Sequence, residues 1–279
     1  MRRALPILLA LSVALPVLAG STDEDRAHAP APTATDHGAA PVSVYRLDLA
    51  WDIPVSAVAA AAIIVPYALT DSIIHPRCPC SISEVPGFDR WAVGHASDAM
   101  DTLSTVTAGL AMLAPFAVDL ADVGPGTPFL EDSAVVAETL LVNGALVTLA
   151  KYTVQRPIPR VYSPGTPAYV NSPSDYRSFY SGHTSNAFAA LTAMSMTWTL
   201  RHGGTWWPWV VTGVAGTSVA LERVLAGRHF PSDVLAGAAA GTLVGLAVPW
   251  LHARARLGPG AVEIEPVGEG VMLAWEGRW

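Results

Sequence analysis

Lysine and cysteine are scarce in this sequence, and no basic patch is present. Lys151 is the only lysine among sixteen cationic residues, and Cys78 and Cys80 are the only cysteines. Charged residues make up 14% of the chain and are scattered, and the formal net charge is -7. We therefore expect no nucleic-acid partner, because proteins bind nucleic acids through clustered positive charge.

The cysteine content limits the covalent and metal chemistry of the chain. Cys78 and Cys80 are separated by a single proline and would close a very small ring if they were paired. With His75 nearby they supply three possible metal ligands, and no second cluster provides the fourth that a structural zinc site needs. We expect an incidental loop feature here and no metal site.

Apolar residues dominate the sequence. They make up 51% of the chain, and the mean hydropathy is +0.38, which is typical of membrane-embedded helical proteins. Six apolar segments have about 17 to 19 residues each, near the length that a bilayer core requires. Tryptophans gather at the ends of the last two segments, as at membrane interfaces. The sequence predicts an all-α bundle of about six apolar helices, embedded in a membrane; buried helices of a globular protein are the alternative. The six segments are Ile53–Thr70, Thr102–Val118, Ser133–Ala150, Thr184–Leu200, Gly203–Leu221 and Val234–Leu251.

The two ends of the chain differ from this apolar body. Residues 1–19 have the charged, apolar and small-residue layout of a secretory signal, for which an uncleaved anchor is the alternative. Residues 20–50 are rich in Ala, Pro and Thr in their first half and predict a flexible linker. We expect a helical domain over residues 51–255. Residues 256–279 alternate apolar and polar positions around Gly-Glu-Gly and predict a short β-hairpin tail.

Polar residues gather at three places, each at an end of an apolar segment. The first place is Lys151 with Arg156 and Arg160 in the proline-broken loop that follows. Basic side chains at a membrane edge would explain this group equally well.

The second place is Ser181-Gly182-His183, directly before an apolar helix. Serine is a preferred helix cap, and the free N–H groups of a helix start bind anions, so a phosphate could lie there beside His183. A plain cap with an interfacial histidine is the alternative.

The third place joins Arg223, His229 and Asp233. Asp233 lies near the predicted start of the sixth helix and can turn back to the imidazole of His229. A carboxylate on one ring nitrogen fixes the tautomer and leaves the other nitrogen free as a nucleophile.

Together the three groups resemble the signature of the type 2 phosphatidic acid phosphatase and vanadium haloperoxidase superfamily. That signature has lysine, six residues and Arg-Pro; then Pro-Ser-Gly-His; then Ser-Arg, five residues, His, three residues and Asp. In this chain the second part is Tyr-Ser-Gly-His at 180–183. The third part is Glu-Arg at 222–223, with His229 and Asp233 at the expected spacing, and it is the most specific.

Three positions depart from this signature. Tyr180 replaces proline, which should alter only loop stiffness, and Glu222 replaces serine, which would place an acid beside the phosphate site. Ile158 stands where the first arginine belongs. In an extended loop Arg156 and Arg160 lie on the same face as residue 158, so we expect one of them to replace it, with Arg156 favoured because it is closer to the helix end and Arg160 as the alternative.

The resemblance implies a mechanism and a set of site residues. His229 attacks phosphorus, Asp233 orients it, and His183 protonates the leaving oxygen. No cofactor or metal is required, because cationic side chains stabilise the phosphoryl group. The phosphate-binding residues implied are Lys151, Arg156, Arg160, Ser181, Gly182 and Arg223.

The predicted function is a metal-independent phosphatase that cleaves phosphate monoesters or diphosphates, with a lipid phosphate and the membrane as its partners. Phosphatidate, phosphatidylglycerophosphate, undecaprenyl diphosphate and lipid A phosphates all fit. A vanadate-dependent haloperoxidase and a non-catalytic phosphate or lipid binder are the alternatives. We expect a bacterial-type cell envelope protein, integral to the membrane with its site at the periplasmic edge; a soluble periplasmic or outer-membrane-associated protein is the alternative. If the N-terminus lies outside and every segment crosses, however, Lys151 faces the cytoplasm.

Overall fold

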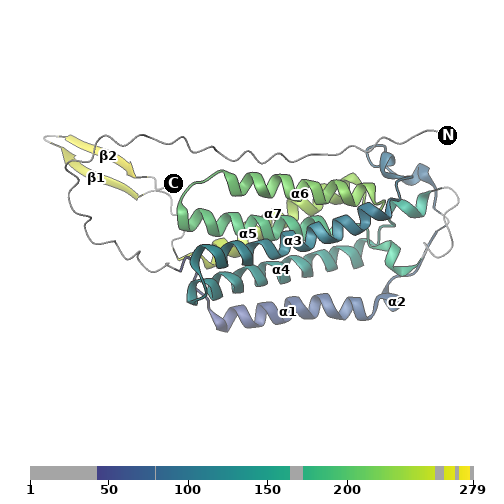
Figure 1. The fold of residues 1–279 in the computed structure, drawn as a ribbon, viewed down its shortest axis with the longest axis horizontal. Coiled ribbons are helices and arrows are strands. Elements are labelled where there is room, and N and C mark those ends of the chain that lie inside the picture. Colours follow the sequence, from purple (N-terminus) through teal and green to yellow (C-terminus); the bar gives the residue numbers. More distant parts are fainter. Residues whose placement is uncertain (1–42, 79, 164–171, 255–260, 268–269, 277–279) are drawn as a thin grey trace, which may run out of the picture. The chain divides into compact units, whose positions relative to one another are not determined.

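The computed structural model describes residues 43–78, 80–163, 172–254, 261–267 and 270–276, and its main body is all-helical (Figure 1). Each of the six predicted apolar segments lies largely within one long helix, so this part of the prediction is confirmed. The long helices are α1 (Leu49–Ala68), α3 (Asp98–Val123), α4 (Thr127–Val154), α5 (Gly182–His202), α6 (Trp207–Leu225) and α7 (Pro231–His252). The short ones are α2 (Thr70–Ile73) and the 3-10 turns η1 (Ile82–Glu84), η2 (Arg90–Ala92), η3 (Pro159–Tyr162) and η5 (Pro173–Tyr176). In the predicted tail, β1 (Ala261–Val267) pairs antiparallel with β2 (Gly270–Glu276).

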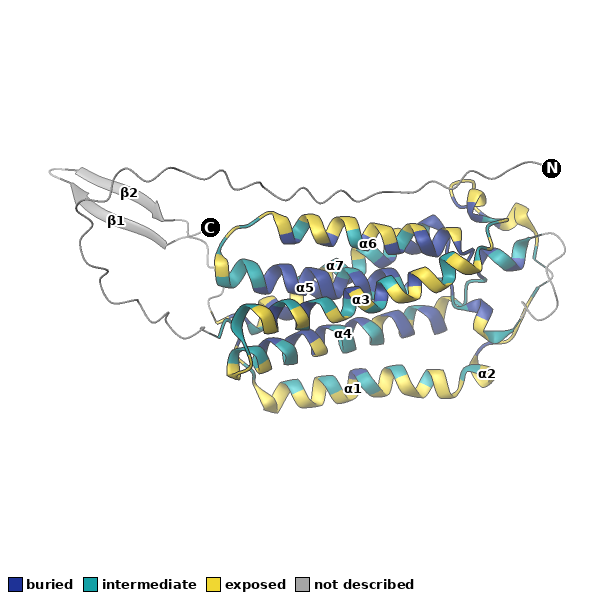
Figure 2. Cartoon of the chain, in the orientation of Figure 1, coloured by how far each residue is buried: buried dark blue, intermediate teal, exposed yellow. Residues whose placement is uncertain are grey.

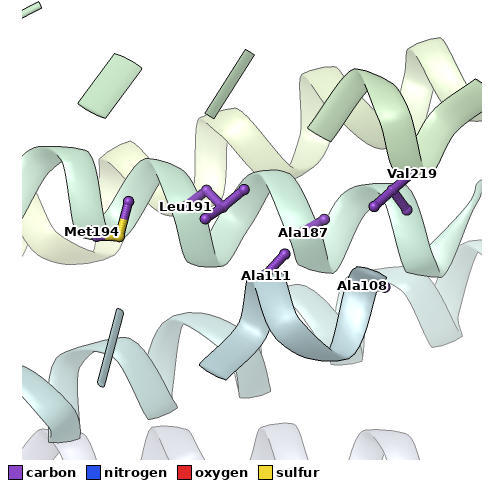
Figure 3. Close-up of a cluster of buried hydrophobic side chains, with 6 residues drawn as sticks. All are labelled: Ala108, Ala111, Ala187, Leu191, Met194 and Val219. Carbon is purple, nitrogen blue, oxygen red and sulfur yellow. The ribbon is translucent and has the colours of Figure 1, made fainter. Parts of the chain in front are cut away.

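Helix α5 is the centre of the bundle. It packs on α3, α4, α6 and α7, and most of its length is buried (Figure 2). Small side chains allow this close packing: Ala187 of α5 meets Ala108 and Ala111 of α3, beside Leu191 (Figure 3). The start of α5, which carries the Ser-Gly-His group, is therefore fixed by four neighbouring helices.

Three glycines of α7 let it approach the backbone of α5. Gly237, Gly241 and Gly245 are spaced by four residues and so lie on one face of the helix. A Cβ at Gly241 would lie only 2.1 Å from the carbonyl oxygen of Ser185. At Gly237 and Gly245 it would lie 2.7 and 2.5 Å from the carbonyl oxygens of the α5 cap Ser181 and of Ala189. The glycines thereby bring the start of α7, just after His229, against the start of α5.

Four of the described helical stretches are long and apolar enough to cross a membrane: Leu49–Ala68, Asp98–Val123, Thr127–Tyr162 and Pro231–His252. Helices α5 and α6 do not meet the same criterion. Ala59 is the only buried residue of α1, and most of the other residues of this helix are exposed (Figure 2). Trp51, Trp206 and Trp250 are exposed at the end of the bundle where α1 and α6 begin and α7 ends. This pattern supports an integral membrane protein.

The predicted signal, residues 1–19, lies outside the described residues, and so does most of the predicted linker. The last part of residues 20–50 is packed rather than free. Tyr45 is fully buried, its hydroxyl lies 2.8 Å from Oγ1 of Thr197, and it bridges to Ala253. Cys78 and Cys80, expected as an incidental loop feature, are joined by a disulfide.

Candidate active site

The three polar groups meet at one end of the bundle. Lys151 is in the last turn of α4, His183 in the first turn of α5 and Arg223 in the last turn of α6, while His229 lies between α6 and α7. They surround a cavity of about 760 Å³. The polar residues in its wall are Thr105, Thr148, Lys151, Ser174, Arg177, His183, Asn186, Arg223, Arg228 and His229.

His229 lines this cavity as a neutral imidazole with one fixed tautomer. Its side chain is nearly fully buried, and burial lowers its pKa to about 3 against the opposing effect of the nearby Asp233 carboxylate. Its Nδ1 lies 2.7 Å from the carbonyl oxygen of Ser178, which can only accept, so Nδ1 carries the proton. Nε2 therefore keeps its lone pair, as a nucleophile requires.

Asp233 acts on His229 chiefly through Ser178. Its Oδ2 is 3.9 Å from Nδ1 of His229, beyond hydrogen-bond range. The same oxygen accepts from the Ser178 hydroxyl at 2.5 Å and from the amide of Phe230 at 2.9 Å. Asp233 thus holds Ser178, whose carbonyl orients the imidazole. Sequence spacing could not identify Ser178, which is 51 positions from His229.

His183 lies in the cavity wall close to two cations. Burial, then Arg223 and Lys151, lower its pKa to about 4. An anion between these cations would offset their effect and raise the pKa of His183 again. His183 can therefore gain acid character when a phosphate is bound.

Asp101 of α3 positions two of the arginines. Its Oδ1 accepts from Nη1 of Arg223 at 2.7 Å, and its Oδ2 accepts from Arg228 at 3.0 and 2.6 Å. The Nε of Arg223 is buried and has no hydrogen-bond partner among the described residues. Lys151 is also buried, and its Nζ donates to the carbonyl oxygen of Arg177 at 2.5 Å. The unpaired Nε of Arg223 and the ammonium of Lys151, which has three donors in all, fit an oxyanion.

Residues 133–257, which include every residue predicted for this site, match the model of the PAP2 superfamily. Over this stretch, a little under half of its length, the chain is similar to the PAP2 superfamily. The resemblance recognised in the sequence is thereby confirmed. Lipid A 1-phosphatase of Porphyromonas gingivalis is 37% identical over 116 residues, which are 40% of this chain and 22% of that protein. The chain therefore matches about a fifth of that relative's length. No solved structure matches the chain significantly.

Neither arginine expected to replace Ile158 lies in the cavity wall. Arg156 donates to Asp233 at 2.5 Å and to Asp89 at 2.7 Å. Arg160 donates to the carbonyl oxygen of Ala226 at 2.8 Å and to Asp98 at 3.0 Å. Two carboxylates therefore hold Arg156 outside the cavity wall, and this position does not support its predicted contact with phosphate.

Arg177 and Arg228 are two further cations in the cavity wall. Ile158 is in the wall, as the motif position requires. The guanidinium of Arg177 lies over the ring of Tyr67 of α1, with 4.9 Å between its central carbon and the ring centroid. No family spacing marks these arginines, although Arg228 directly precedes His229. The sequence alone missed both.

The remaining predicted residues divide between the cavity and its support. Gly182 is in the wall, where a Cβ would lie 3.1 Å from Val147. Ser181 is fully buried and caps α5, its Oγ accepting from the amide of Thr184 at 3.4 Å. Glu222 was expected to place an acid beside the phosphate, but its carboxylate accepts from Thr107 at 2.5 Å and is not in the cavity wall.

The rest of the cavity wall is apolar. It extends along α4 from Lys151 back to Ala137, about 20 Å at the rise of an α-helix. Helix α1 contributes Ile63 and Tyr67 to this wall. A hydrocarbon chain would bury apolar surface here while its polar end reached His229. The other apolar residues in the wall are Ala108, Met112, Phe116, Leu140, Leu141 and Val147.

Proposed function

We propose that this chain is a phosphatase that hydrolyses the phosphate ester or diphosphate of a lipid, without a metal, through a phosphohistidine on His229. The observation that carries the proposal is a neutral imidazole, fixed by Ser178, in a cavity that is also lined by Arg223, whose buried Nε has no hydrogen-bond partner among the described residues. The similarity of residues 133–257 to the PAP2 superfamily supports phosphoester hydrolysis as the reaction class.

The reaction has two steps. In the first, the Nε2 lone pair of His229 attacks phosphorus, the bond to the leaving oxygen breaks, and that oxygen takes a proton from His183. In the second, a water molecule gives a proton to His183 and attacks phosphorus, and the P–N bond breaks. Inorganic phosphate leaves, and both histidines return to their starting protonation states. A general acid contributes about 10² to 10⁴ in rate.

Fixed cations stabilise the charge on the transferred group. Lys151 and Arg223 face the cavity beside His183, and Arg228 is held next to Arg223 by Asp101. We assign the role of the missing motif arginine to Arg177, because it lines the cavity. Among the described residues its guanidinium contacts an aromatic ring, a tyrosine hydroxyl and a backbone carbonyl oxygen rather than a carboxylate. These cations supply the electrostatic stabilisation on which phosphoryl transfer depends.

A lipid is the proposed substrate because the phosphate site opens into an apolar wall about 20 Å long. The similarity to Lipid A 1-phosphatase is consistent with a phosphorylated lipid. We place the site at the periplasmic edge of the membrane. The amide of Cys78 donates to Tyr176 at 2.8 Å near this end of the bundle, and a Cys78–Cys80 disulfide persists only in an oxidising compartment.

The test is phosphate release by the purified protein in EDTA, from a panel of lipid phosphates, a lipid diphosphate and an aryl phosphate. Wild type should release phosphate, be inhibited by vanadate and form a labelled phosphoenzyme. His229→Ala should lose turnover and label, whereas His75→Ala, at an exposed histidine, should keep both. Label retained by His229→Ala would contradict the phosphohistidine, and peroxidase activity with added vanadate in place of hydrolysis would favour the haloperoxidase reading.

A further inference from the structure

A second cluster of ionisable side chains lies at the opposite end of the bundle from His229. Asp52 near the start of α1, Glu138 of α4 and His252 at the end of α7 each direct one ligand-type atom to a common point, with all three atoms within 4.8 Å of one another. Nε2 of His252 is 3.2 Å from Oδ1 of Asp52 and 3.4 Å from Oε2 of Glu138. Atoms around one metal ion at about 2.1 Å have such separations.

Outer contacts orient two of the three groups. Nδ1 of His252 donates to the carbonyl oxygen of Val248 at 2.8 Å, so Nε2 is left to face the carboxylates. Oδ2 of Asp52 accepts from the amide of Asp48 at 2.7 Å, which turns Oδ1 toward the histidine. Backbone contacts that fix the tautomer of a histidine and the rotation of a carboxylate are typical of metal ligands.

The buried carboxylate of Glu138 needs a positive partner. Glu138 is 8% exposed, and the interaction recorded for its side chain among the described residues is the one with His252. Glu138 and Asp52 also line a cavity of about 260 Å³, which gives an ion an entry path and room for water ligands. Two carboxylates and a neutral imidazole carry a charge of -2, which a divalent cation neutralises.

We propose that Asp52, Glu138 and His252 bind a divalent transition-metal ion of the Zn²⁺ or Mn²⁺ class. One imidazole nitrogen with two carboxylate oxygens suits these ions, whereas Ca²⁺ and Mg²⁺ prefer oxygen ligands alone. The site is separate from the phosphatase reaction and takes no part in it.

The ion clamps α1 to the bundle. Helix α1 packs mainly on α4, and Ala59 is its only buried residue, so side-chain burial holds it weakly. The three ligands join α1 to both α4 and α7. Ile63 and Tyr67, eleven and fifteen positions after Asp52, form part of the wall of the catalytic cavity. The clamp therefore fixes that wall from a point about 16 Å or more along the same helix.

The test measures metal content and thermal unfolding of the full-length protein in detergent. After EDTA treatment and dialysis, wild type should take up one Zn²⁺ per chain. A hundredfold excess of Zn²⁺ over its Kd should raise the Tm by about 5 to 10 °C. Glu138→Gln and His252→Gln should lose both effects. Glu131→Gln is the matched control, because this acid also lies near the start of α4 but contacts Arg254 instead.

The wild-type titration alone can overturn the proposal. If the wild type takes up neither Zn²⁺ nor Mn²⁺ and its Tm does not rise, the two carboxylates are paired with a doubly protonated His252 and not with a metal ion. An equal rise in Glu138→Gln would show that zinc binds elsewhere. Tm of each variant in EDTA shows whether it is folded. Phosphate release per folded protein should persist in EDTA, so loss of the clamp and failure of the proposed reaction give different results.

Discussion

Asp101 provides the sharpest test of the proposed phosphate site. This carboxylate touches no reacting atom in the mechanism, yet it bonds both Arg223 and Arg228. Asp101→Asn keeps the shape and one acceptor oxygen but replaces the other oxygen with a donor, which cannot bond a guanidinium. At least one of the two arginines should then leave its position.

The expected loss follows from one displaced arginine. A hydrogen bond between charged groups contributes about 1.5 to 3 kcal/mol, which corresponds to roughly 10- to 160-fold in rate. Removing a negative charge near the cavity also reduces repulsion of the anionic substrate. We therefore expect kcat of Asp101→Asn to fall by at least about tenfold while KM stays equal or falls.

Steady-state kinetics with an aryl phosphate and with a lipid phosphate would measure both constants. Asp98→Asn is the matched control: Asp98 is in the same first turn of α3, its side chain is 90% exposed, and it contacts Arg160 outside the cavity wall. A wild-type kcat in Asp101→Asn would refute the role given to the two arginines. A tenfold loss in Asp98→Asn as well would point to a general disturbance of α3.

Three further predictions concern other parts of the site and its support. Burial and nearby cations lower the pKa of His183 to about 4, and a bound phosphate raises it again. The pH profile of kcat, which reports the complex, should therefore have its basic limb about 1 to 3 pH units above that of kcat/KM, which reports the free enzyme. Coincident limbs would contradict the role of His183 as the acid. Gly241→Ala should lower the Tm by about 2 to 12 °C, since its Cβ would meet an α5 carbonyl at 2.1 Å, whereas Gly213→Ala, with nothing within 4 Å, should not lower it. Arg177→Ala should reduce catalytic efficiency at least about tenfold with little change in Tm. Arg156→Ala should in addition lower the Tm. The same losses of efficiency and Tm in both variants would argue against Arg177 as the replacement for the motif arginine.

The helices and the central residues of the site could be predicted because their signals are local. Apolar runs of bilayer length mark six helices, and the four-residue step from His229 to Asp233 places both near one helix start. Asp101 and Ser178 could not be predicted in this way. They lie 122 and 51 positions from the side chains that they orient, and no spacing rule connects such distant residues.

The replacement for the missing arginine could not be predicted for a different reason. The argument for Arg156 assumed an extended loop with free side chains. In the structure Ile158 leads directly into the 3-10 turn η3, and Arg156 is drawn to the carboxylates of Asp89 and Asp233. Competition between a ligand and internal carboxylates for one guanidinium depends on the complete fold.

Three long helices precede the site in the chain, so the side of the membrane on which residue 43 lies determines the side on which the site lies if all three cross the bilayer. Helices α1, α3 and α4 precede Lys151, so α1 begins at one end of the bundle and the site lies at the other. If these three helices cross the bilayer, a reporter attached near residue 43 and the site must lie in different compartments. A leader that delivers residue 43 to the periplasm would place His229 in the cytoplasm, where a Cys78–Cys80 disulfide would be reduced. The redox state of these two cysteines in intact cells therefore reads out the orientation of the catalytic end without any measurement of catalysis.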